Sequence, residues 1–337
     1  MSKAKIKIRA LPPFKEIQGL LYGVLSEKYD VEISDNCYDL IIGSTQTPIE
    51  LLNCEGIKLF YTGENIVPDF NLYDYAIGFD YLDFGDRYLR LPLYCLYSEF
   101  EGLITQSFQT SEEKRLNRKF CSMVVSNSNY ASPLRREFFE ELSKYKRVDS
   151  AGQYMNNMGG GYLEDKQSFI SQYKFSIAFE NSSVPGYTTE KLMQALAADT
   201  LPIYWGNPLV GRDFNPKSFV NLQDFKSIKD CVDYIVYLDQ NDEKYLEILH
   251  ENKFNPEENY KDYKERIWVF FDHILMQENV SRLSPYGRQA AYRKEQIDKA
   301  VCYKKFHTIE SDAFLKRYYA LKSKAYKWVQ RLAHRDQ

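Results

Sequence analysis

The chain has 337 residues, more than the ~100 to 150 of a usual domain, so two domains are expected. Its formal net charge of -3 at pH 7 excludes a general attraction to nucleic acid, so any anion must bind through a local group of cations. The six cysteines are scattered and include no CxxC pair, which predicts a protein whose cysteines are reduced. We find no secretory signal and no apolar run long enough to cross a bilayer, so we expect a cytoplasmic protein.

Short apolar runs alternate with one helical pattern in the first third of the chain, which is typical of a parallel α/β sheet. The helical pattern covers residues 15–29, where apolar residues recur on one face. The predicted strands are residues 6–8, 31–33, 40–42, 57–61 and 75–79. This part of the chain therefore predicts a Rossmann-like domain.

A polar, mixed stretch at 84–119 predicts the connection to a second domain, which begins with an apolar run at 121–125. A helix is then expected, with Ser132 as its cap and Pro133 in its first position. The clearest unit follows, with strand 175–179, loop 180–187, helix 189–198 and strand 201–205. Two such domains in tandem predict the GT-B architecture, in which two Rossmann-like domains face a cleft and the ligand lies beyond the carboxyl ends of the strands.

The predicted domains are residues 1–115 and 116–300, followed by a basic, amphipathic helical tail at 301–337. Apolar residues of the tail recur every three or four positions, and its cations lie away from them. Such a helix fits an anionic membrane surface or a partner helix. The alternative is a helix that packs on its own domain.

Two cations of the second domain have the placement and chemistry to bind an anion. Lys191 falls in the first turn of helix 189–198, where backbone N–H groups and the helix dipole favour a negative charge. Arg135 falls in the first turn of another predicted helix and offers bidentate donors to phosphate. For each of them an ordinary solvated cation is the alternative.

One carboxylate of the first domain has the placement of a general base. Glu64 follows strand 57–61 and comes directly after Gly63, which lets a ligand approach the backbone. A carboxylate there is well placed to take a proton from an attacking hydroxyl. A solvated loop carboxylate is the alternative.

Several sequence blocks together resemble glycosyltransferase family 10, the α-1,3-fucosyltransferases. The blocks are YTGENIVPDFNLYDYAIGFD from residue 61, SNSNYASPLRREFFEEL from 126, FENSSVPGYTTEK from 179, LPIYWGNP from 201 and DFNPKSFVNLQDF from 213. The resemblance covers most of residues 57–225 and implies the same GT-B fold.

The resemblance also implies roles for individual residues. Glu64 is similar to the family's catalytic base, and Arg135 and Lys191 are similar to the cations that hold the GDP diphosphate. The remaining implied donor-binding positions are Ser126, Asn127, Glu180, Asn181, Tyr187 and Glu190. The implied reaction is inverting transfer of L-fucose from GDP-β-L-fucose to the 3-hydroxyl of N-acetylglucosamine in N-acetyllactosamine-type glycans, with no metal or other cofactor required.

Two alternatives stay open. The same fold could serve transfer to another hydroxyl, as in an α-1,4 linkage, or transfer from a related GDP-deoxyhexose. A non-catalytic scaffold that binds a glycan or nucleotide is the second alternative. The expected partners are GDP-fucose, a galactose-N-acetylglucosamine glycan and, through the tail, the inner face of the cytoplasmic membrane.

Overall fold

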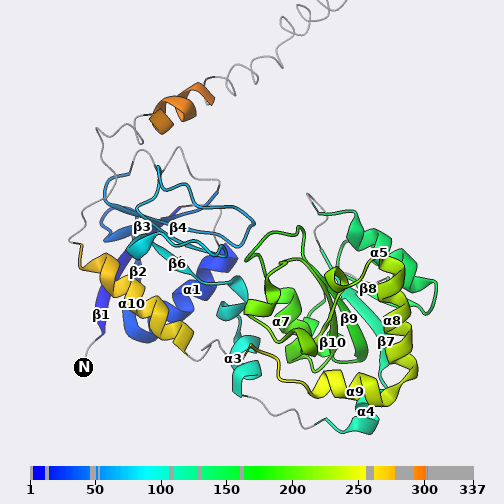
Figure 1. Cartoon of the computed structure of the whole chain (residues 1–337). Coiled ribbons are helices and arrows are strands. Elements are labelled where there is room, and N and C mark those ends of the chain that lie inside the picture. The colour runs from blue at the N-terminus through cyan, green and yellow to red at the C-terminus, as the bar shows by residue number, and fades with distance from the viewer. Residues whose placement is uncertain are drawn as a thin grey trace, which may run out of the picture.

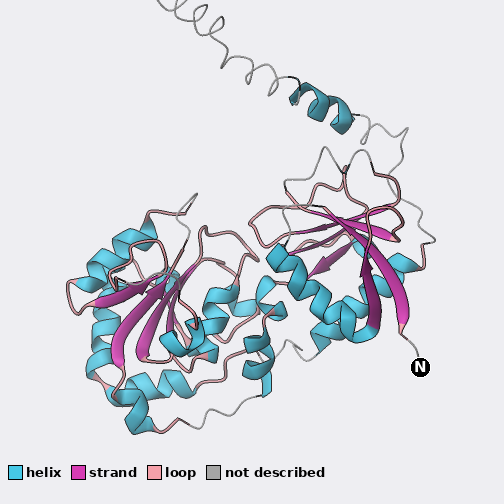
Figure 2. Cartoon of the chain, turned by 180° about the vertical axis from the view of Figure 1, so that it is seen from behind, coloured by secondary structure: helices cyan, strands magenta, loops and turns pink. Residues whose placement is uncertain are grey.

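The computed structural model describes residues 3–11, 15–45, 51, 54–105, 110–126, 131–159, 163–255, 262–277, 292–300 and 302. These residues form two parallel β-sheets, each with its own helices, that follow one another along the chain (Figure 1). Seen from behind, the two halves remain distinct lobes with helical segments between them (Figure 2).

The first sheet has six parallel strands in the order β2-β1-β3-β4-β5-β6. Its strands are β1 (Ala4–Ala10), β2 (Tyr29–Ile33), β3 (Leu40–Gly43), β4 (Ile57–Tyr61), β5 (Tyr75–Gly78) and β6 (Tyr88–Arg90). In β1, Ile6 and Ile8 alternate with less buried residues and are fully buried, because neighbouring side chains of a strand point to opposite faces. Helix α1 (Lys15–Lys28) connects β1 to β2.

The second sheet has five parallel strands in the order β11-β10-β9-β7-β8. Its strands are β7 (Lys119–Val124), β8 (Val148–Ala151), β9 (Tyr173–Phe179), β10 (Leu201–Trp205) and β11 (Val220–Asn221). Every residue of the central strand β9 is buried, as expected where helices cover both faces. The accompanying helices are α4 (Glu112–Leu116), α5 (Leu134–Ser143), α6 (Lys166–Ile170), α7 (Glu190–Ala197), α8 (Ile228–Gln240) and α9 (Asp242–His250).

Helix α10 (Tyr263–Leu275) returns from the second lobe to the first sheet, where it lies beside α1 (Figure 1). The Trp268 indole donates to the carbonyl of Val24 at 3.1 Å, and Asp272 accepts from the Tyr29 hydroxyl at 2.6 Å. A helix at 292–300 also contacts the first lobe, through the ion pair of Arg293 with Asp69. The predicted range 116–300 placed these helices in the second domain, whereas in the structure they pack on the first.

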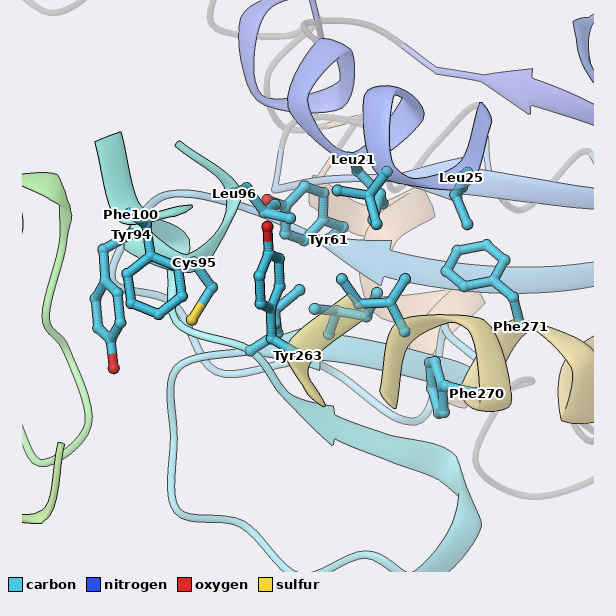
Figure 3. Packing of buried hydrophobic residues seen from close by; sticks show 14 of the residues in the cluster. Leu21, Leu25, Tyr61, Tyr94, Cys95, Leu96, Phe100, Tyr263, Phe270 and Phe271 are labelled. Carbon is cyan, nitrogen blue, oxygen red and sulfur yellow. The ribbon is translucent and has the colours of Figure 1, made fainter. Parts of the chain in front are cut away.

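An apolar core runs without interruption from the first lobe into the second. Helix α3 (Ser98–Thr105) and the 3-10 turn Leu93–Leu96 supply its middle section. Tyr94 lies between Phe100, with ring centroids 5.4 Å apart, and Phe214 of the second lobe, 5.0 Å away. Figure 3 shows Tyr94 and Phe100 at the side of the cluster that faces the second lobe. The lobes are therefore joined by packing as well as by the chain.

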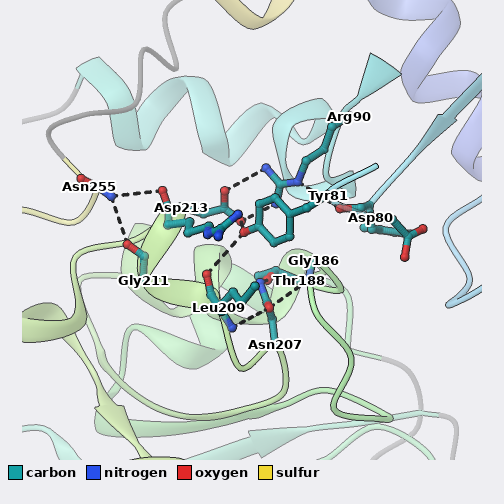
Figure 4. Close-up of polar contacts among 12 residues, drawn as sticks. Asp80, Tyr81, Arg90, Gly186, Thr188, Asn207, Leu209, Gly211, Asp213 and Asn255 are labelled. Atoms are coloured by element: carbon teal, nitrogen blue, oxygen red, sulfur yellow. Dashed lines mark hydrogen bonds and ion pairs between the residues drawn. The ribbon is translucent and has the colours of Figure 1, made fainter. Parts of the chain in front are cut away.

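A polar cluster also bridges the lobes (Figure 4). The guanidinium of Arg90 donates to both carboxylate oxygens of Asp213, at 2.9 and 2.7 Å, and lies over the ring of Tyr81 at 4.0 Å. Asp213 is 1% exposed, and removing one partner of a buried pair typically costs about 3 to 5 kcal/mol. This pair therefore helps to fix how the lobes face each other.

The predicted GT-B fold is confirmed: two Rossmann-like domains with parallel sheets face one another. One predicted helix start differs by a residue, because α5 begins at Leu134 with Pro133 as its N-cap. Ser132 still accepts from the backbone N–H of Leu134, at 3.3 Å. The predicted tail at 301–337 lies outside the described residues, apart from 302. None of the described helices is both long and apolar enough to cross a membrane.

Candidate active site

A cavity of about 410 Å³ lies between the two lobes, beyond the carboxyl ends of strands from both sheets. The first lobe lines it with Gly63, Glu64 and Leu93. The second lobe lines it with residues at or after the ends of its strands and at or before the starts of its helices: Val124, Val125, Ser126, Gly152, Gln153, Leu163, Lys166, Asn181, Tyr187, Thr189, Glu190 and Lys191. Six of the nine predicted site residues line this one cavity.

Glu64 lies on the exposed loop after β4, held from both sides. Its backbone N–H donates to the hydroxyl of Thr62 at 3.1 Å, and its carbonyl accepts from the backbone N–H of Ile66 at 2.8 Å. The next residue, Asn65, donates from its side chain to the hydroxyl of Ser182 in the second lobe at 2.7 Å. The loop that carries the Glu64 carboxylate is therefore anchored on both lobes.

Glu180, at the end of β9, supports the other side of the cavity without lining it. It is 1% exposed, and its carboxylate accepts from the backbone N–H and the hydroxyl of Thr189, each at 2.7 Å. The same carboxylate pairs with the ammonium of Lys191 at 3.3 Å. Glu180 therefore fixes the start of α7 and the direction of Lys191.

Lys191, Glu190 and Lys166 form the charged wall of the cavity. Burial alone would lower the pKa of Lys191, but the carboxylates of Glu180 and Glu190 outweigh it and raise the pKa. Burial alone would raise the pKa of Glu190, but the ammonium groups of Lys191 and Lys166 lower it to about 2. Burial lowers the pKa of Lys166, against the opposing effect of Glu190. Glu190 is therefore ionised at neutral pH.

Arg135 is not among the cavity-lining residues, although it belongs to the same network. It is 2% exposed, and its guanidinium donates to the carbonyl of Phe179 at 2.8 Å and to the side-chain oxygen of Asn181 at 2.9 Å. Burial lowers its pKa from the ordinary value. Arg135 therefore reaches the cavity through Asn181, and direct contact with a diphosphate stays a prediction.

Tyr187 brings the two lobes together at the cavity. It is 3% exposed and packs edge-on against Phe79 of the first lobe, with ring centroids 5.1 Å apart. The preceding Gly186 has a φ of +91°, and a Cβ there would meet the carbonyl oxygen of Phe79 at 2.4 Å. The Asn207 side chain accepts from the backbone N–H of Gly186 at 2.9 Å (Figure 4). A glycine is required because two backbones meet here.

The far end of the cavity is formed where β7 and β8 end. Gly152 has a φ of +93°, and a Cβ there would lie 2.4 Å from the carbonyl oxygen of Val125. Ser126, which follows Val125, is exposed and lines the cavity. Its predicted neighbour Asn127 lies outside the described residues.

Sequence reasoning missed several lining residues, among them Lys166 and Thr189. Thr189 lies inside the recognised 179–191 block, so it could have been found there. Lys166 follows Asp165, whose carboxylate caps α6. A capping aspartate predicts the start of a helix, but it does not predict that Lys166 lies close to Lys191. That closeness depends on how α6 packs against α7.

The described residues contain no group of three or more His, Cys, Asp and Glu side chains arranged to hold a metal ion. Chemically, the cavity offers a carboxylate on one lobe and two ammonium groups with a buried helix start on the other. Such a site can accept a proton on one side and hold an anion on the other.

Two family models match the chain. The model described as glycosyltransferase family 10 (fucosyltransferase), C-terminal part, matches residues 114–271. The model of the N-terminal domain of α-(1,3)-fucosyltransferases matches residues 8–97. The two matches therefore cover both lobes.

Relatives and solved structures agree with these matches. An α-(1,3)-fucosyltransferase of Helicobacter pylori is 36% identical over 310 residues, covering 79% of this chain and 64% of that enzyme. A GDP-fucose protein O-fucosyltransferase 3 of Xenopus laevis is 32% identical over 178 residues, covering 48% of this chain and 38% of that protein. The chain thus spans less than two thirds of the length of these relatives.

Two crystal structures of α1,3-fucosyltransferase share the arrangement of both lobes. One superposes with a TM-score of 0.72 at 36% identity, covering 82% of this chain and 91% of the other. The second, solved with GDP-fucose, has a TM-score of 0.71 at 35% identity, covering 83% and 93%.

Proposed function

Because the chain belongs to glycosyltransferase family 10, the fucosyltransferases, we propose that it transfers L-fucose from GDP-β-L-fucose to a glycan hydroxyl. The observation that supports this proposal most strongly is that Glu64 of one lobe and Lys191 of the other line the same cavity. A non-catalytic scaffold would have no need for an exposed carboxylate opposite an anion-binding wall.

The proposed reaction is a single displacement with inversion at the anomeric carbon. The acceptor hydroxyl attacks this carbon, its proton passes to the Glu64 carboxylate, and the bond to the GDP oxygen breaks. Negative charge then grows on the leaving diphosphate, and the Lys191 ammonium with the N–H groups at the start of α7 stabilises it. Because Glu180 already holds Lys191 in place, little reorganisation is needed as that charge develops.

For the acceptor we propose the 3-hydroxyl of N-acetylglucosamine in an N-acetyllactosamine-type glycan. The support is the similarity to α-(1,3)-fucosyltransferases across both lobes. Transfer to a 4-hydroxyl, or from a related GDP-deoxyhexose, changes few contacts and is the second candidate.

The test is incubation of the whole chain with GDP-fucose and with lactose, N-acetyllactosamine or its β-1,3 isomer. NMR of the product should show an α-linked fucose on O3 of N-acetylglucosamine. A fucose on O4 of the isomer would favour the second candidate. No product from any of the acceptors, with GDP-fucose left intact, would contradict the proposed function.

We also propose that transfer needs no divalent metal, because side-chain cations and a helix start carry the charge of the leaving group. Chelation with EDTA is expected to leave the initial rate of fucose transfer unchanged within about twofold, since no barrier-lowering group would be removed. The rate is measured before and after addition of Mg²⁺ or Mn²⁺ to the chelated enzyme. A large loss with EDTA that either metal restores would contradict the prediction.

Residues 312–337 form the distal part of the predicted basic tail, and we propose that the tail binds an anionic membrane surface at the inner face of the cytoplasmic membrane. Each cation near such a surface contributes about 1 kcal/mol, an attraction that salt screens. Deleting residues 312–337 is expected to abolish co-sedimentation with anionic vesicles at low salt and to keep most activity on soluble acceptors. Loss of activity together with aggregation would instead show that the tail packs on the protein.

A further inference from the structure

Two lysines of the cavity wall share one carboxylate oxygen. The Nζ atom of Lys166 lies 3.7 Å from Oε1 of Glu190, and the Nζ atom of Lys191 lies 3.4 Å from the same oxygen. Lys166 comes from α6 and Lys191 from α7, so the packing of these helices brings the two ammonium groups together. Like charges repel, so the two ammonium groups stay together only with an anion between them, and here that anion is the Glu190 carboxylate.

The charges of this wall do not cancel. With Arg135 and Glu180, which belong to the same network without lining the cavity, there are three basic groups, Lys166, Lys191 and Arg135, and two carboxylates, Glu180 and Glu190, a formal excess of one positive charge. All five groups are buried or half-buried, so solvent screens the excess positive charge weakly. The wall therefore attracts an anion that can replace Glu190 as the partner of the lysines.

The three cations differ in their access to the cavity. Arg135 is 2% exposed and engaged with Phe179 and Asn181, whereas Lys166 and Lys191 both line the cavity. The Lys166 side chain is 29% exposed, compared with 72% for Lys229 on the surface of the same lobe. Lys166 is thus half-buried with its ammonium directed at the cavity wall.

We propose that Lys166 is a further diphosphate-binding cation, which together with Lys191 clamps the donor nucleotide. Glu190 is the counter-ion that keeps the two ammonium groups together before the diphosphate enters. This inference rests on the proposed function, since it concerns the nucleoside diphosphate of that donor. The flexible stem of each lysine allows the small movement from the carboxylate to the phosphates.

The test compares binding of GDP and of guanosine to the whole chain by calorimetry. Lys166→Met is expected to weaken GDP binding roughly ten- to a hundredfold, the loss expected for one charged hydrogen bond, and to leave guanosine binding unchanged. Lys166→Arg should retain most of the GDP affinity because it keeps the charge. Lys229→Met, which removes a lysine paired with Asp233 away from the cavity, is the matched control and should change neither.

If Lys166→Met binds GDP with the parent affinity, the proposal is wrong. It is also wrong if the variant loses affinity for guanosine and for GDP to the same degree, because that would indicate a structural role for Lys166. Melting temperatures identify a variant that does not fold, and Lys166→Gln then provides the same measurement. If the parent chain transfers fucose while Lys166→Met keeps its GDP affinity, the proposed function stands and this inference is wrong. A parent chain that binds no GDP would contradict the proposed function itself.

Discussion

Glu64→Gln is expected to lower the rate of fucose transfer at least about a hundredfold with both substrates saturating, while GDP binding stays unchanged. Glutamine keeps the size of the side chain but cannot take the acceptor proton, and positioned general bases typically contribute about 10² to 10⁴ in rate. Because Glu64 is exposed and its loop is held through backbone atoms and Asn65, the variant should fold normally. Turnover and GDP affinity are measured on the same preparation.

Glu180→Gln is the matched control, because Glu180 is the other carboxylate that the sequence places at a strand end. Its carboxylate accepts from Thr189 and pairs with Lys191, so its replacement should weaken GDP binding and lower the melting temperature. If Glu64→Gln instead transfers fucose at close to the parent rate, the proton leaves by another route and the proposed mechanism is wrong.

Lys191→Ala is expected to weaken the use of GDP-fucose and the binding of GDP by about ten- to a hundredfold or more. A hydrogen bond to a charged group contributes about 1.5 to 3 kcal/mol, and here the lost ammonium also leaves Glu180 and Glu190 without a shared cation. Calorimetry with GDP and kcat/KM for GDP-fucose are the measurements.

Arg135→Ala provides the comparison for this prediction. It should weaken GDP binding to a similar degree, and it should lower the melting temperature more, because Arg135 is 2% exposed and bonds to Phe179 and Asn181. GDP affinity at the parent level in both variants would remove both residues from the diphosphate site.

Much of the fold could be predicted because its central strands are uninterrupted apolar runs. Strands β4 and β9 and the helix after β9 have unambiguous patterns and were found within a residue or two. Strand β8 was missed because Asp149 and Ser150 break its apolar pattern, and β6 because it has only three residues. Short strands like these depend on their neighbours in the sheet, which no local pattern reveals.

The sequence blocks predict which residues belong to the site, but they do not predict how those residues are arranged in space. Taken alone, Glu64, Arg135 and Lys191 each had an ordinary solvated alternative, and only their occurrence in recognised blocks favoured a site. The burial of Arg135 and the convergence of Lys166 on Glu190 arise from packing between helices and strands that are distant in sequence. This burial and this contact depend on tertiary packing, so the spacing of residues along the chain does not predict them.

The return of α10 to the first sheet determines the order in which the protein can be completed during synthesis. Ile267, Phe271 and Ile274 of α10 are fully buried in the core that also contains Ile6 and Leu21. A chain that ends at residue 115 lacks α10, so the part of this core that α10 covers is exposed to water. The lobe made first should reach its native state last, after the second lobe has been synthesised, and a fragment ending at residue 115 should aggregate rather than fold.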